Sequence, residues 1–140
     1  MKIRNLKKEE LEIILPWINE TVKITLGEFW NPETIKENVI KSFKKEPEGF
    51  IGIEENSELI AFIRIKTLKN NTCHISDLYV KKEFRGKGLG KKLMEIADEY
   101  AKRKGAKRIT LNVRKDNEPA LNLYKKSGFK IKKYQMWKIL

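Results

Sequence analysis

The first third of the chain shows one short alternating segment followed by the hydrophobic spacing of helices. Met1 to Leu6 places Ile3 between polar neighbours and predicts a short strand. From Glu9 to about Ile24, apolar residues recur every three or four positions, as on one face of a helix. Pro16 inside this segment predicts a kink or a break, because proline removes a backbone donor. Asn31-Pro32-Glu33 predicts the start of a second helix.

The middle of the chain is rich in apolar runs bounded by polar turns. Three strands are predicted, at Gly49 to Glu54, Leu59 to Leu68 and Cys73 to Val80. Asn56-Ser57 and Lys69-Asn70-Asn71 are the turns between them. Turns this short predict that the three strands run antiparallel to one another.

The last third alternates helix and strand. The pattern predicts a helix from about Gly88 to Lys104, a strand from Arg108 to Val113 and a helix from Asn117 to Ser127. Phe129 to Leu140 suggests two last strands, the final one being Tyr134 to Leu140. This order of elements predicts an α+β fold, a three-layer arrangement with a mixed, mostly antiparallel sheet flanked by helices.

Composition favours one folded domain spanning residues 1–140. Hydrophobic residues make up 40% of the chain, enough for a core, and disorder would require low hydrophobicity with unbalanced charge. The longest fully apolar run, Leu59 to Ile63, is far shorter than the roughly 20 residues of a membrane span. No stretch of signal-peptide type opens the chain. We therefore expect a soluble, cytoplasmic protein with no membrane partner.

The cysteine and histidine content and the net charge limit the disulfides, metal sites and partners that are expected. Cys73 is the single cysteine and His74 the single histidine, so neither a disulfide nor a Cys- or His-rich metal site is expected. The net charge of +12 favours an anionic partner, and nucleic acid, acidic membrane and a phosphorylated cofactor all fit it. A Lys- and Glu-rich solvated surface, as in heat-adapted proteins, explains the charge equally well.

A glycine-rich turn, Arg85 to Gly90, leads from the third predicted strand into the following helix. Glycines let a backbone approach a ligand closely, and a helix N-terminus presents free N–H groups that suit a phosphate. The spacing is not that of a P-loop, because neither Gly86 nor Gly88 has a glycine five residues on. It is not the dinucleotide fingerprint either, because Lys91 replaces the last glycine. A tight connection without a ligand is the alternative.

Two segments carry a shared pattern. The first is Arg85-x-x-Gly88-x-Gly90 after Leu78-Tyr79-Val80, and the second is Asn117-x-x-Ala120-x-x-Leu123-Tyr124-x-x-x-Gly128-Phe129. Together they resemble the acyl-CoA signature and the downstream segment of the GCN5-related N-acetyltransferases, the GNAT superfamily. The resemblance implies an acetyltransferase that moves an acetyl group from acetyl-CoA to a primary amine of a small molecule or a protein, by direct attack in a ternary complex.

The resemblance also implies how acetyl-CoA is held, with no metal. In this family the strand before the glycine turn splays from its neighbour and binds the pantetheine arm, an N–H near Leu78 polarises the thioester carbonyl, and the amides of the turn hold the pyrophosphate. Asn117 would touch the cofactor arm, although a helix N-cap role fits it equally well. The implied cofactor-binding residues are Leu78, Tyr79, Val80, Arg85, Gly86, Lys87, Gly88, Leu89, Gly90, Lys91, Asn117 and Tyr124.

Tyr124 is the candidate general acid and Asp77 the preferred general base. A tyrosine with a pKa of about 10 stays protonated at neutral pH and can supply a proton to the departing thiolate. A packed aromatic side chain is the alternative for Tyr124. Asp77 and His74 share one predicted strand and point to opposite faces unless a bulge intervenes, so at most one is expected to face the site. Asp77 could also be a structural carboxylate.

The acceptor and the alternative functions stay open. Glu28, Phe29 and Trp30 fall where the family places its acceptor site and could attract a cationic amine, or Trp30 could anchor its loop to the core. A basic nucleic-acid-binding module is disfavoured, because lysines are dispersed and no basic strand with interleaved aromatics occurs. A GNAT-like domain that binds acyl-CoA without catalysis is a third reading. The sequence does not identify the amine, and a homodimer is among the options.

Overall fold

The computed structural model describes residues 1–140 and contains one five-stranded sheet in the order β1-β2-β3-β4-β5. The strands are β1 (Lys2–Asn5), β2 (Phe50–Glu55), β3 (Glu58–Leu68), β4 (Thr72–Val80) and β5 (Arg108–Leu111). Neighbours pair antiparallel from β1 to β4, whereas β4 and β5 are parallel. The predicted mixed, mostly antiparallel sheet is therefore confirmed.

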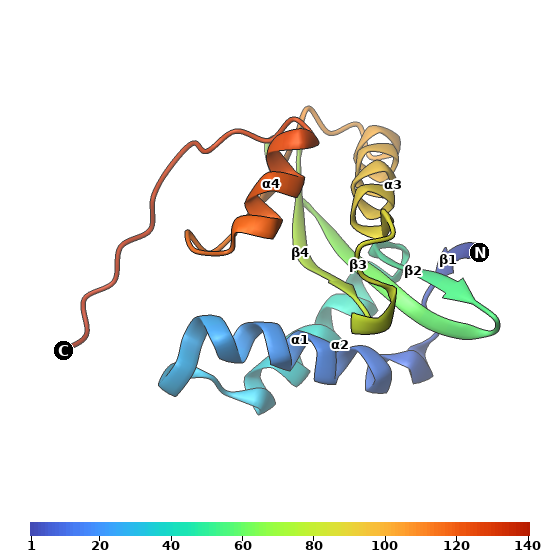
Figure 1. Ribbon diagram of the computed structural model, residues 1–140, viewed down its shortest axis with the longest axis horizontal. Coiled ribbons are helices and arrows are strands. Elements are labelled where there is room, and N and C mark those ends of the chain that lie inside the picture. The colour runs from blue at the N-terminus through green and yellow to red at the C-terminus, as the bar shows by residue number, and fades with distance from the viewer.

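Helices cover both faces of this sheet (Figure 1). They are α1 (Leu11–Leu26), α2 (Pro32–Lys45), α3 (Leu89–Arg103) and α4 (Glu118–Lys126). The first two helices lie against one face and the last two against the other. Each face has its own apolar core: buried residues of α3 pack with the isoleucines of the sheet, and Ile14 and Val39 pack with Phe50 and Phe62 on the α1/α2 side.

The predicted helices form for the expected local reasons, with one exception. Asn31 caps α2 by accepting hydrogen bonds from the amides of Glu33 and Thr34 at 3.1 and 3.3 Å. Helix α1, in contrast, runs unbroken through Pro16, so no break occurs there. Pro16 is exposed and removes only one intrahelical donor, and water can replace that bond on the solvent side.

The two last strands predicted for Phe129 to Leu140 are wrong. Residues 129–140 form no helix or strand, are almost entirely exposed and extend away from the body of the molecule (Figure 1). The ring of Trp137 meets Phe29 edge-on, with centroids 6.2 Å apart. Alternation of apolar side chains favours an extended chain, but a strand also needs a neighbour for its backbone hydrogen bonds, and β5 has only β4 beside it.

A bulge in β4 positions the side chains of the site. Ile75 and Asp77 face Ile65 and Arg64, which are consecutive in β3, so Ser76 is an extra residue. The bulge reverses the alternation of side chains. Ile75 before it and Leu78 after it both pack on the α3 side of the sheet, so His74 and Asp77 both face the α1/α2 side. The expected opposite orientation of the two side chains therefore does not occur, because a bulge, the named exception, lies between them.

The sheet opens immediately after this bulge. The last paired residues of β4 and β5 are Ile75 and Leu111. From Ser76 to Val80, β4 has β3 along one edge and no strand along the other. The chain between β5 and α4 makes no backbone hydrogen bond with β4, so this edge of β4 is unpaired from Ser76 onward.

Candidate functional site

The glycines of the turn are there for two different reasons. Gly86 and Gly88 have φ values of +76° and +83°, in the left-handed region that glycine favours, and a Cβ at either would meet no atom within 4 Å. Gly90 differs, because a Cβ there would lie 3.0 Å from Cδ2 of Leu123 in α4. The absence of a side chain at Gly90 therefore allows the close packing of α3 against Leu123 of α4.

The amides of residues 86–91 donate no hydrogen bond within the protein. The amides of Phe84 and Arg85 close a short 3₁₀ turn, and the amide of Lys92 donates to the carbonyl of Gly88 at 3.1 Å. The six amides between them surround the N-terminus of α3, where the helix dipole also favours an anion. This array can hold a phosphate or a diphosphate.

Cationic side chains surround the turn. Arg85 donates from Nε to the carbonyl oxygen of Val80 at 2.8 Å, so it fastens the turn to the end of β4. A hollow of about 600 Å³ beside the turn is lined in part by Lys87, Gly88 and Lys92. Positive charge and free amides therefore occur together here.

Four of the twelve predicted cofactor residues have side chains that pack on the α3/α4 side of the sheet. Leu78 and Val80 from β4, Leu89 from α3 and Tyr124 from α4 all pack against the same core cluster. Tyr79 lies on the opposite face, where its ring stacks on Trp17 of α1 with centroids 4.9 Å apart. The backbone of the predicted segment Leu78 to Val80, rather than all of its side chains, therefore faces the opening beside β4.

Tyr124 has a free hydroxyl in a partly buried position. Its ring lies 6.0 Å from that of Phe129, edge-on, and its hydroxyl makes no hydrogen bond within the protein. Burial raises the pKa of Tyr124 above the ordinary value for tyrosine. The hydroxyl therefore stays protonated through neutral and mildly alkaline pH, as a proton donor must.

Asn117 is the N-cap of α4, which is one of the two roles predicted for it. Its Oδ1 accepts a hydrogen bond from the amide of Ala120 at 3.3 Å, at the start of α4. Contact with the cofactor arm stays a prediction for this residue.

Asp77 is part of a buried ion pair. Its Oδ2 accepts a 2.6 Å hydrogen bond from Nε of Arg64, which is 7% exposed. Nη1 of Arg64 also donates to Oδ1 of Asn38 in α2 at 3.1 Å. The sequence carried a signal for this pair, because Arg64 is a lone charge in the apolar run of β3 and a buried charge needs a partner.

His74 stands beside Asp77 at the point where β4 and β5 separate. Its Nδ1 lies 2.7 Å from Oγ1 of Thr110 in β5. Burial lowers the pKa of His74, and the charges of Lys66 and Arg64 lower it further, against an opposite effect of Asp77. The imidazole is therefore neutral at pH 7 and able to accept a proton.

An unpredicted cluster lies on the α1 side of the end of β4. The hydroxyl of Tyr79 donates to Oε2 of Glu20 at 2.6 Å, while the guanidinium of Arg85 lies 5.2 Å from the centre of the Tyr79 ring. Burial, together with the carboxylate of Glu20, raises the pKa of Tyr79. Trp17 and Glu20 are three apart on α1, a spacing that places them on the same side of the helix, and neither was assigned a role from the sequence.

The predicted acceptor loop is fastened to α1. Nε1 of Trp30 donates to Oδ1 of Asn19 at 2.9 Å, and Nζ of Lys23 lies 4.9 Å from its ring centre. Glu28 and Phe29 are exposed. The anchoring role considered for Trp30 is therefore observed, with α1 rather than the core as its partner.

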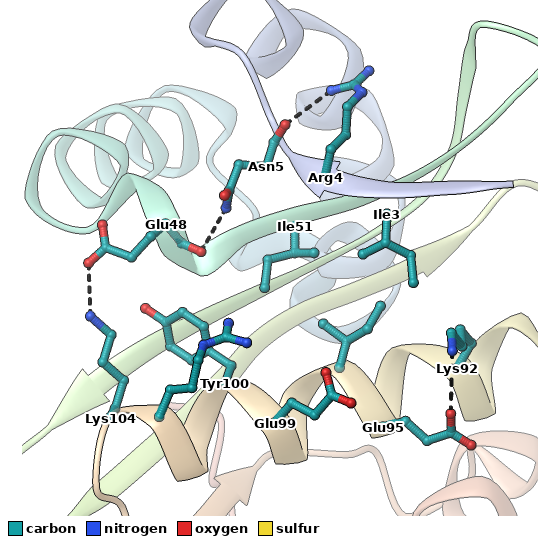
Figure 2. A pocket seen from close by; sticks show the side chains of 12 residues that line it. Ile3, Arg4, Asn5, Glu48, Ile51, Lys92, Glu95, Glu99, Tyr100 and Lys104 are labelled. Carbon is teal, nitrogen blue, oxygen red and sulfur yellow. Dashed lines mark hydrogen bonds and ion pairs between the residues drawn. The ribbon is translucent and has the colours of Figure 1, made fainter.

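A second hollow, of about 420 Å³, lies between β1 and α3 (Figure 2). None of the predicted site residues lines it. Its charges are largely paired within the protein: Lys104 contacts Glu48 at 3.0 Å, and Arg4 contacts Glu10 at 2.8 Å. This hollow therefore belongs to the structural framework rather than to the site at the glycine turn.

Two further observations concern metals and membranes. No group of three or more His, Cys, Asp and Glu side chains comes together in an arrangement that could hold a metal ion. None of the helices combines the length and the apolar character that crossing a membrane requires.

Comparison with known proteins gives consistent results. The chain matches the model of the acetyltransferase (GNAT) family over residues 11–129. It is 29% identical to a spermidine N(1)-acetyltransferase of Thermoplasma acidophilum, over 94% of this chain and 89% of that protein. It is 31% identical to a putative ribosomal protein bS18-alanine N-acetyltransferase of Bacillus subtilis, over 90% and 78%. The crystal structure of PaiA N-acetyltransferase from Thermoplasma acidophilum in complex with coenzyme A is similar, with a TM-score of 0.78, 28% identity and coverage of 96% of this chain and 92% of that one.

A charge at Gly88 tests the anion site. We expect Gly88→Glu to weaken acetyl-CoA binding about 100-fold or more, equivalent to about 3 kcal/mol, because a carboxylate would stand where the diphosphate binds. Isothermal titration calorimetry measures this. Gly105→Glu is the matched control, since Gly105 has a similar φ of +74° and open space around it but lies beyond the other end of α3. Equal affinity of the two folded variants would remove the anion site from this turn.

The Arg64–Asp77 pair generates a stability prediction. Asp77→Ala should lower the free energy of unfolding by about 3–5 kcal/mol, because it leaves the buried Arg64 charge without its carboxylate. Urea denaturation measures the change. The double variant Arg64→Met/Asp77→Leu should recover most of the loss, and Asp116→Ala, in an exposed ion pair with Arg114, should change stability little. A stable Asp77→Ala protein would contradict the importance of the pair.

Proposed function

The chain belongs to the acetyltransferase (GNAT) family, and on that premise we propose how its own residues carry the transfer of an acetyl group to an amine. The chain is an acetyl-CoA-dependent N-acetyltransferase. The observation that supports the residue assignment is the array of free amides at residues 86–91, next to a strand edge that opens toward Tyr124.

We assign the binding of acetyl-CoA to this array and to the open edge of β4. The amides from Gly86 to Lys91 hold the pyrophosphate, with Lys87 adding charge. The backbone of Leu78 to Val80 lies along the pantetheine arm, and an amide near Leu78 polarises the thioester carbonyl. Asn117 contacts the arm in addition to capping α4. These assignments rest on the geometry of the turn and on the open strand edge.

Tyr124 supplies the proton that the departing thiolate takes up. Its hydroxyl is free of partners in the protein, and its raised pKa keeps the proton in place until the thiolate forms. It lies on the α3/α4 side with the cofactor residues. The amine enters from the α1/α2 side, so the two reactants meet in the opening between β4 and β5.

The amine must lose a proton on the side where His74 and Asp77 lie. Asp77 remains our candidate base: Arg64 occupies its Oδ2, whereas its Oδ1 has no partner in the protein. Neutral His74 stands on the same face as the second candidate, and a water molecule could connect either group to the amine. Because both residues lie on the same face of β4, the face on which each lies no longer decides between them.

The acceptor we propose is a small cationic amine of the polyamine class. Glu20, the stacked pair of Trp17 and Tyr79, and Asp77 face the side from which the amine enters, and a carboxylate beside aromatic rings attracts an ammonium group. The Thermoplasma acidophilum relative is a spermidine N(1)-acetyltransferase and is matched over nearly its whole length. The cytoplasmic location and a homodimer stay predictions, as does the absence of a nucleic-acid partner.

Tyr124→Phe tests the acid. We expect kcat to fall about 100-fold with acetyl-CoA affinity nearly unchanged, the pattern for loss of an interaction made in the transition state. Steady-state thiol release and calorimetry measure the two quantities. Tyr134→Phe, on the exposed C-terminal segment, is the matched control and should behave as the wild type. Wild-type turnover in Tyr124→Phe would eliminate the assignment.

A panel of amines tests the acceptor. Thiol release from acetyl-CoA should be fastest with spermidine or spermine and slower with amino acids and with peptides that begin with alanine. Glu20→Gln should raise KM for the polyamine about 10-fold, because it removes one charge contact of about 1.4 kcal/mol, with KM for acetyl-CoA unchanged. Glu12→Gln, exposed elsewhere on α1, is the control. A peptide as the best substrate would overturn the proposed acceptor class.

A further inference from the structure

Ser76 carries the one buried side-chain polar atom without a hydrogen-bond partner. Its Oγ is shielded from solvent and contacts no donor or acceptor in the chain. Proteins satisfy almost all of their buried polar groups, and an unsatisfied one lowers stability, so its retention calls for an explanation. Alanine at this position would remove the unpaired group without leaving a large cavity.

The position of Ser76 is equally unusual. It is the extra residue of the β4 bulge, and it is the first residue after the last pair between β4 and β5. It therefore lies at the apex of the opening into which the thioester must enter. Bulges recur next to active sites, where they redirect a side chain.

The hydroxyl of Thr72, on the same strand, has hydrogen-bond partners, in contrast to that of Ser76. It is 3% exposed, its Oγ1 donates to the carbonyl of Asn70 at 3.0 Å, and the same oxygen accepts from Nε of Arg108 at 2.7 Å. The unpaired state of Ser76 is thus a local property of the bulge and not of the strand.

We propose that the Ser76 hydroxyl donates a hydrogen bond to the acetyl oxygen while the amine attacks, an inference that rests on the proposed acetyltransferase function. The amine nitrogen bonds to the carbonyl carbon, and the electron pair of the C=O bond moves to the oxygen, where Ser76 stabilises the negative charge without giving up its proton. The pair then returns, the C–S bond breaks, and the thiolate takes its proton from Tyr124. The proton of the amine leaves to the base or to water.

The hydroxyl can reach this oxygen by a change of one torsion angle. Ser76 as a residue is partly exposed although its Oγ is not, and a serine side chain has three staggered χ1 rotamers. For the proposed role, one of the other two rotamers must place Oγ in the opening. The hydroxyl gives up no protein hydrogen bond when it turns, because it has none. Its hydrogen bond to the oxyanion therefore replaces no hydrogen bond within the protein.

Ser76→Ala separates this role from a structural one. We expect kcat to fall about 100-fold, as on loss of one oxyanion donor, with both KM values changed less than about threefold. The melting temperature should stay the same or rise, because an unsatisfied hydroxyl is removed. Ser76→Thr, which keeps a hydroxyl, should retain most of the turnover, and Ser76→Cys, with a weaker donor, should fall between the two.

Thr72→Val is the matched control, with the opposite expected pattern. It should lower the melting temperature, because two hydrogen bonds are lost, and leave kcat unchanged. A Ser76→Ala protein with kcat within twofold of the wild type would overturn the proposal. So would a lower melting temperature with intact kcat, or equal losses in the alanine and threonine variants. A wild-type protein that binds acetyl-CoA but acetylates no amine would count against the proposed function itself.

Discussion

The structure depends on the point at which β4 stops pairing with β5. A sheet buries its backbone polar groups in ladders, and an interruption leaves donors and acceptors that something else must bind. Here the interruption follows the bulge at Ser76, and it is bounded by α4 on one side and α1 on the other. In the proposed mechanism this opening gives a thioester access to strand backbone from one face and an amine access from the other. The proposed site is therefore a gap in the sheet, and its residues are those that border the gap.

The charged groups on the two sides of this opening differ in sign. The net charge of +12 is high, but around the acceptor side the carboxylates of Glu20 and Asp77 engage Tyr79 and Arg64. On the cofactor side the glycine turn combines lysines with amides that no protein group uses. An anion and a cation would thus bind on opposite faces of one sheet, which is the arrangement that bringing a CoA ester and an ammonium group together requires.

Much of the fold followed from periodicity, and the family followed from two motifs, whereas the roles of the site residues stay predictions. The strands and helices up to α4 formed within a few residues of their predicted ends, because apolar spacing and caps such as Asn31 act locally. The sequence left a bulge in β4 open but could not establish it, since one extra residue leaves no mark in an alternating pattern, so the relative orientation of His74 and Asp77 required the structure. The last residues show the reverse case: their alternation was real, but pairing depends on a neighbour that the pattern does not contain.

The contact between Gly90 and Leu123 has a geometric consequence. It lets α3 approach α4 closely enough for the Leu123 side chain to lie against the backbone of Gly90, so a larger residue at position 90 would have to displace Leu123. The N-terminus of α3 presents the amides of the glycine turn, and α4 carries Tyr124. If the turn holds the diphosphate and Tyr124 the proton, as proposed, the packing at Gly90 sets how far apart the two ends of the bound carrier must lie.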